Sequence, residues 1–161
     1  MNDIPNNNSI EKQPVIGITM GDPVGIGAEI IVKALAEPEI RKAAKFIIFG
    51  MNEQLVYAAD RGEIEPFWGR VQHERISREF PYKAVVADYD EYSIPTWLKE
   101  ASKVSGESSA RFCLDAIEAA KRNIIDAVVT APINKTSWIN ELRCGGRTAL
   151  RTGDCIYRVQ N

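Results

Sequence analysis

The residues with the clearest chemical potential form a glycine-rich turn near the N-terminus. Gly21-Asp22-Pro23-Val24-Gly25-Ile26-Gly27 follows a short apolar run, and its three glycines allow a sharp turn and close approach to a ligand. The start of a following helix would offer N–H groups that favour an anion. The spacing G-x-x-x-G-x-G matches neither the dinucleotide-binding G-x-G-x-x-G nor the P-loop pattern. Two interpretations stay open: an anion site, or a tight strand–helix turn without a ligand.

A second candidate is the segment Thr130-Ala131-Pro132-Ile133-Asn134-Lys135, which follows another apolar run. A lysine just beyond a strand end, near a helix start, can hold a phosphate or a carboxylate. A solvated surface lysine is the alternative, and the residue type alone slightly favours it. We therefore take Asp22 and Lys135 as candidate catalytic groups, with Gly21, Gly25 and Gly27 as turn-forming residues.

The histidine and the cysteines give weaker evidence of a functional site than these two segments do. The single histidine, His73, lies in a polar, charged stretch, which predicts a surface residue. Cys113, Cys144 and Cys155 lack the spacing of a disulfide framework or a zinc site, and Cys113 falls in a helical pattern that predicts a core position. No multi-histidine metal site can be built from one histidine, so no metal ligand is predicted in this sequence.

The elements that position these residues are apolar strands alternating with amphipathic helices. Strands are predicted at Val15–Thr19, Phe46–Phe49, Ala84–Ala87 and Ala127–Ala131, with helices at Ala28–Ala36, Leu55–Asp60 and Ser105–Asn123. Pro38 is expected to close the first helix, Asn52 to cap the second and Gly62 to stop it. The segment 62–82 has no clean period and is expected to be irregular, with one short strand near 71–76.

The third helix carries the clearest stripe of apolar residues. Its members recur at helical spacing and are Ala110, Cys113, Leu114, Ile117 and Ala120. The alternation predicts an α/β fold with a mostly parallel sheet and helices on both faces. Ligands of such sheets bind at the carboxyl ends of the strands. The second strand ends in Gly50 instead of the acidic residue that would hold a ribose, so a Rossmann nucleotide site is disfavoured.

Composition places the chain among ordinary globular proteins. It has 161 residues, 45% hydrophobic and 26% charged, with a net charge of −2. This charge gives no general attraction to nucleic acid or to anionic membrane, and no apolar run has the length of a membrane span. The N-terminal segment is polar and lacks the pattern of a signal peptide, so a cytoplasmic location is expected.

Three segments follow from these patterns. Residues 1–13 are expected to be a disordered tail, 14–140 an α/β domain, and 141–161 a divergent C-terminal tail. The last segment contains Arg143, Arg147, Arg151 and Arg158. A basic patch for phosphate or nucleic acid is one interpretation of these arginines, but the absence of an apolar period favours an irregular tail.

Two long motifs resemble one known family. Ile18–Leu35, ITMGDPVGIGAEIIVKAL, resembles the N-terminal signature of the 4-hydroxythreonine-4-phosphate dehydrogenases, which include phospho-threonate and phospho-erythronate dehydrogenases. Asp126–Trp138, DAVVTAPINKTSW, resembles the second block of that family, and Ser105-Gly106-Glu107 lies where it has a Gly/Ala-rich helix. Ala28 stands where many members have proline. The resemblance covers about Val15–Trp138, the N-terminal half of the family fold.

The resemblance implies a fold akin to isocitrate and isopropylmalate dehydrogenases, and a homodimer. It implies NAD- or NADP-dependent oxidation, with decarboxylation, of a phosphorylated hydroxy acid such as 4-phosphooxy-threonine, in pyridoxal phosphate biosynthesis or sugar-acid catabolism. A divalent metal such as zinc, magnesium or cobalt, held by three histidines, would act as a Lewis acid on the substrate. No residue of this chain is assigned to the cofactor.

The sequence departs from the family after the second block. The family's G-H-T-E motif is echoed by Gly146-Arg147-Thr148-Ala149, so Thr148 and Arg147 are the candidate substrate-binding residues. Arg151-Thr152-Gly153 echoes a later R-T-G. The metal histidines belong to a part of the family fold beyond these residues, and His73 matches none of them. A reading-frame shift or gene decay would produce this pattern. Apolar sheet faces left uncovered by such a truncation would favour low stability or aggregation.

Three functional hypotheses follow. The first is a metal- and NAD-dependent dehydrogenase by family. The second is a truncated, inactive fragment or pseudoenzyme that at most binds a phosphorylated ligand. The third, an acyl-phosphate transferase on a related scaffold, is disfavoured by the G-D-P-x-G-I-G motif.

Overall fold

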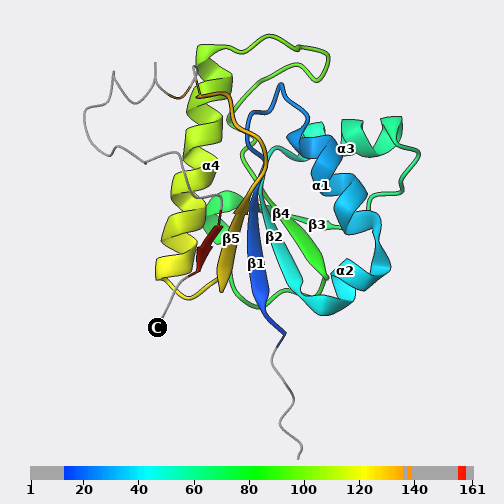
Figure 1. The fold of residues 1–161 in the computed structure, drawn as a ribbon, viewed down its shortest axis with the longest axis vertical. Helices are drawn as coiled ribbons and strands as arrows, with labels where there is room; N and C mark the ends of the chain where they lie inside the picture. Colours follow the sequence, from blue (N-terminus) through cyan, green and yellow to red (C-terminus); the bar gives the residue numbers. More distant parts are fainter. Residues whose placement is uncertain (1–12, 136–137, 139–155, 159–161) are drawn as a thin grey trace, which may run out of the picture.

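A computed structural model describes residues 13–135, 138 and 156–158 of the chain. These residues form an α/β sandwich with one sheet between two layers of helices (Figure 1). The strands are β1 (Val15–Thr19), β2 (Lys45–Gly50), β3 (Gly69–Gln72), β4 (Ala84–Asp88), β5 (Ala127–Thr130) and β6 (Ile156–Arg158). The helices are α1 (Gly27–Ala36), α2 (Pro38–Ala43), α3 (Asn52–Arg61) and α4 (Lys103–Lys121), with a 3₁₀ turn at His73–Arg75.

The strand order β3-β4-β2-β1-β5-β6 puts the first strand in the middle of the sheet. All neighbouring pairs are parallel except β5 and β6, which are antiparallel. Helix α4 covers one face and helices α1 and α3 cover the other, as Figure 1 shows. The predicted fold class, a mostly parallel sheet with helices on both faces, is therefore confirmed. Of the segment 141–161, expected to be irregular, the structure describes β6 alone.

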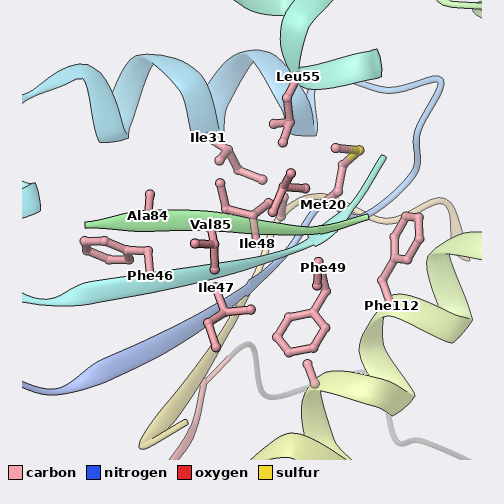
Figure 2. Packing of buried hydrophobic residues seen from close by; sticks show 14 of the residues in the cluster. Met20, Ile31, Phe46, Ile47, Ile48, Phe49, Leu55, Ala84, Val85 and Phe112 are labelled. Atoms are coloured by element: carbon pink, nitrogen blue, oxygen red, sulfur yellow. The ribbon is translucent and has the colours of Figure 1, made fainter. Parts of the chain in front are cut away.

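The core has two apolar layers that share the sheet. Strand β2 is buried along almost its whole length, as expected for a strand covered on both faces. Ile48 faces Ile31 of α1 and Leu55 of α3, whereas Phe49 faces Phe112 of α4 (Figure 2). Each of these side chains has at most 4% of its surface exposed, so their burial stabilises the fold.

One of two short-range predictions about the helices is confirmed and the other is wrong. The first helix ends at Ala36, before Pro38, as predicted, and Pro38 is then the first residue of α2, where its missing N–H costs nothing. Asn52 does not cap α3: it is the first helical residue, and its N–H donates to Asp88 Oδ1 at 2.7 Å. A carboxylate far away in the sequence thus replaces the local cap.

The buried face of helix α4 overlaps the predicted stripe in part. Its buried residues include Phe112, Ala116 and Ala119, whereas Leu114 is 44% exposed. The stripe prediction is wrong at Leu114, although Cys113 is buried as predicted. The buried face also holds three serines: Ser105 and Ser108 have hydroxyl partners within the same turn of the chain, whereas Ser109 Oγ accepts from Trp138 Nε1. The helix begins after Ser102, which forms a capping box with Ser105.

Candidate functional site at the strand ends

The glycine turn and the segment before Lys135 meet at the carboxyl ends of β1 and β5. The Asp22 N–H donates to the Pro132 carbonyl at 3.1 Å, and the Ala131 N–H donates to the Thr19 carbonyl at 2.9 Å. These bonds continue the pairing of the two strands into the loops that follow them. The two candidate segments, more than 100 residues apart in sequence, therefore form one surface.

Two of the three turn glycines are required by the chain's own backbone. Gly21 has φ +74°, and a Cβ there would lie 2.2 Å from the Pro132 carbonyl oxygen. A Cβ at Gly27 would lie 1.9 Å from the Met20 carbonyl oxygen. Gly25 is exposed, and its Cβ would come no closer than 3.1 Å to the Asp22 oxygen. The geometry thus explains Gly21 and Gly27 by close packing, without a ligand.

The two carboxylates at the strand ends hold backbone N–H groups. Asp22, 6% exposed, accepts the Val24 N–H through Oδ1 at 3.1 Å and so fixes the turn. Asp88, 5% exposed, accepts the Asn52 N–H and also the Arg70 Nε, the latter at 2.5 Å. These contacts give both residues a structural function. The catalytic role of Asp22 stays a prediction.

The remaining candidate residues lie at the margin of the described structure. Lys135 is exposed, at the start of a helical segment in which the Trp138 N–H donates to the Asn134 carbonyl at 3.2 Å. Trp138 is buried and its Nε1 donates to Ser109 Oγ of α4, which ties this segment to the helix. Arg147 and Thr148 lie outside the described residues. The roles assigned to these residues therefore stay predictions.

The prediction that His73 is a surface residue was wrong. Its side chain is 8% exposed and stacks on Tyr89, with ring centroids 4.1 Å apart. Its Nδ1 is buried without a hydrogen-bond partner among the described residues, whereas Nε2 lies 3.5 Å from Glu91. The charged residues next to His73 in the sequence suggested an exposed position. The fold instead brings His73 against Tyr89, the residue after β4, and no local sequence pattern shows this contact.

Tyr89 is the buried member of a polar cluster between the sheet and α4, which also contains Asp115 and Arg111. It is fully buried, and its hydroxyl donates to Asp115 Oδ2 at 2.9 Å, the oxygen that also accepts from Arg111 Nε at 2.8 Å. Burial, first, and the nearby Asp115 charge, second, raise the pKa of Tyr89. The folded chain therefore keeps this proton at pH values where an unfolded chain releases it.

This raised pKa predicts a loss of stability in alkali. Above about pH 10 the unfolded chain ionises Tyr89 while the folded chain does not, so the free energy of unfolding should fall by up to about 1.4 kcal/mol per pH unit. Below the unfolded pKa this contribution is fully present. Urea unfolding at pH 8 to 11 measures the slope. The Tyr89→Phe variant should be less stable than the wild type at pH 8, but its free energy of unfolding should fall less steeply above pH 10. If the variant shows the same slope as the wild type, Tyr89 is not the group responsible.

The described residues contain no group of three or more metal-ligating side chains. In the same part of the chain, no helix has the length and apolarity needed to cross a membrane. Neither observation extends to the segments that the structure leaves undescribed.

Known proteins resemble this chain in sequence and in fold. No family model matches the chain. The D-threonate 4-phosphate dehydrogenase of Cupriavidus necator is 33% identical over 136 residues, which are 83% of this chain and 39% of that protein. A protein of Oceanobacillus iheyensis that carries the same name provisionally is 35% identical over 128 residues, 78% of this chain and 38% of its own length. The chain thus spans about two fifths of the length of the curated relatives it matches.

A solved structure shows the same fold. The 4-hydroxythreonine-4-phosphate dehydrogenase of Burkholderia phymatum matches with a TM-score of 0.69 and 30% identity, over 84% of this chain and 40% of that one. The sheet and its strand-end turn therefore share the fold of the matching part of that dehydrogenase. The resemblance predicted from the two motifs is confirmed: over most of its length, the chain matches the 4-hydroxythreonine-4-phosphate and D-threonate 4-phosphate dehydrogenase family.

Sequence reasoning missed one feature beside this site. A groove between α1 and α3 begins at Pro23 and Gly25 of the glycine turn and contains Arg61 and Lys99. Arg61 lies between the predicted helix Leu55–Asp60 and its expected stop at Gly62, and Lys99 lies in a loop with no period. Neither position carries a local signal, because the groove is made by the packing of two helices and a loop.

Proposed function

We propose that this chain supplies the N-terminal part of a dehydrogenase that oxidises and decarboxylates a phosphorylated hydroxy acid with NAD or NADP. The observation that carries the proposal is the match to named dehydrogenases over about four fifths of the chain. Their names supply the substrate class, D-threonate 4-phosphate or 4-hydroxythreonine 4-phosphate. A homodimer and a cytoplasmic location are proposed on the same resemblance.

The proposed metal does not fit the described residues. Three histidines would be required, and the 161 residues contain one, which is packed against Tyr89. The metal would supply Lewis-acid polarisation of substrate oxygens, but no described residue can be assigned to it, so we derive no catalytic step through it. For the dinucleotide, the closely packed Gly21 and Gly27 have no room to admit phosphates between them and the backbone.

The chain's own contribution is the positioning of polar groups at the strand ends. The Asp22–Pro132 bond fixes the distance between the two loops, and Lys135 follows within one helical turn of Pro132. We propose that the Lys135 ammonium pairs with the carboxylate or phosphate of the substrate. Asp22, through the turn it holds, and Thr148 and Arg147, through the resemblance, complete the proposed set.

A chimera tests this proposal. The matching segment of the Cupriavidus necator enzyme is replaced by residues 14–138 of this chain, and NADH formation from D-threonate 4-phosphate is followed at 340 nm. Retained activity supports the proposal, and Lys135→Met in the chimera should then lower kcat/KM by about 10-fold or more, the effect of losing one charge-assisted contact. A folded chimera without activity would reject it.

The second candidate, an inactive fragment, is favoured by the single histidine. Its signature would be the absence of NADH formation by the 161-residue chain alone, with added divalent metal, in a preparation shown to be folded by circular dichroism. Metal-dependent NADH formation by this chain would rule the second candidate out.

A further inference from the structure

A groove on the outer side of the molecule lies between helices α1 and α3. Its volume is about 100 Å³, and it opens beside the glycine turn. The polar side chains that line it are Glu29, Lys33, Gln54, Tyr57, Arg61 and Lys99. The volume is small beside the roughly 300–1,000 Å³ of pockets that enclose a whole ligand, so the groove suits a single small group.

The charges in the groove are unbalanced. Lys33 and Glu29 form an ion pair with a 2.6 Å separation, which satisfies both. Arg61 and Lys99 make no ion pair with any carboxylate in the described part of the chain. Three cations and one carboxylate give the groove a net charge of +2. The Lys33 contact, with smaller effects from Arg61 and Lys99, also lowers the pKa of Glu29.

The side chains that carry these charges are held near each other by the fold. The Arg61 guanidinium lies 5.9 Å from the Tyr57 ring centroid, one turn back on α3. Gln54, which is buried, donates to the Ile94 carbonyl at 2.9 Å and so fastens the loop before Lys99 to α3. Within that loop the Leu98 N–H donates to the Pro95 carbonyl at 3.0 Å. Lys99 is therefore presented from an anchored turn.

We propose that this groove binds the phosphate group of a small phosphorylated molecule. Arg61 offers a planar donor pair that suits a tetrahedral oxyanion, and Lys99 adds a second positive charge that has no carboxylate partner in the described part of the chain. The remainder of the ligand lies outside, in solvent, because the groove has room for little more than the phosphate. The site is separate from the proposed dehydrogenase function and is tested by binding without turnover, so failure of one leaves the other standing.

Titration of the ¹⁵N-labelled 161-residue chain with inorganic phosphate tests the site directly. At low ionic strength we expect half-saturation on the order of 1 mM, as for a few charge-assisted contacts. The largest amide shifts are expected at Lys33, Arg61 and Lys99, with sodium chloride at equal ionic strength as the reference. Parallel titrations with adenosine monophosphate and 3-phosphoglycerate show whether the phosphate belongs to a nucleotide or to a phosphorylated hydroxy acid. The probe that binds more tightly identifies the class of ligand.

Variants that remove one positive charge test whether Arg61 and Lys99 bind the phosphate. Arg61→Gln and Lys99→Gln should each weaken phosphate binding about 5-fold, and the double variant about 20-fold or more. Lys121→Gln is the matched control, since Lys121 is an exposed lysine on α4, across the sheet. Unfolding curves confirm that each variant is folded. Wild-type affinity in the double variant, shifts that map to another surface, or no preference over chloride would each overturn the proposal.

Discussion

Gly27→Ala is expected to destabilise the chain severely, by about 3 kcal/mol or more, a large share of the 5–15 kcal/mol that holds a typical domain together. The added Cβ would lie 1.9 Å from the Met20 carbonyl oxygen, a backbone atom that cannot rotate away. An open helical position would give the opposite sign, because alanine is favoured over glycine by about 1 kcal/mol. Urea unfolding followed by circular dichroism measures the difference.

Gly25→Ala is the matched control for that experiment. It lies two residues away in the same turn, but it is exposed and its Cβ would stay 3.1 Å from the nearest heavy atom, the Asp22 oxygen. We expect a loss of less than about 1 kcal/mol. Equal effects of the two substitutions would show that the strand β1–helix α1 turn does not pack as described.

Phe112→Ala is expected to cost about 3–5 kcal/mol. Phe112 is fully buried, its ring centroid lies 4.7 Å from that of Tyr89, and its side chain extends from α4 toward Phe49 of the sheet (Figure 2). Removing the ring leaves a cavity that the neighbouring strands cannot fill without moving. The free energy of unfolding and the melting temperature both report the loss.

The comparison for Phe112 is Leu114→Ala, two residues along the same helix. Leu114 is 44% exposed, so its truncation should change stability by about 1 kcal/mol or less. The two variants together measure which face of α4 is buried. A larger loss for Leu114 than for Phe112 would restore the stripe expected from the sequence.

Four of the strands could be predicted because they appear as continuous apolar runs, which is clearest for β2 and β4, both buried along nearly their whole length. Val15–Thr19 was predicted with its observed bounds. The predicted strands for β4 and β5 differ by one residue at one end, and the one for β2 by one residue at each end. The motifs at β1 and β5 also identified the family, since they are long and their order is fixed.

The failures share a physical cause, which is that the deciding partner lies far away in the sequence. Asp88 replaces a local cap on α3, and Tyr89 covers His73. Helix α4 buries serines beside its apolar residues, and one of them, Ser109, pairs with the distant Trp138, so apolar content alone misplaced Leu114. The groove with Arg61 and Lys99 depends on the packing of α1 against α3, which no local pattern encodes.

The central place of β1 has a consequence for the chain as it is synthesised. One edge of β1 pairs with β2 soon after both strands leave the ribosome, but the other edge pairs with β5, and Val15 is bonded to Asp126, 111 residues later. At about 5–20 residues per second, that edge stays open for roughly 5 to 20 s. During this interval the nascent sheet presents an apolar strand edge, which is the period when chaperone binding would most affect the yield of folded protein.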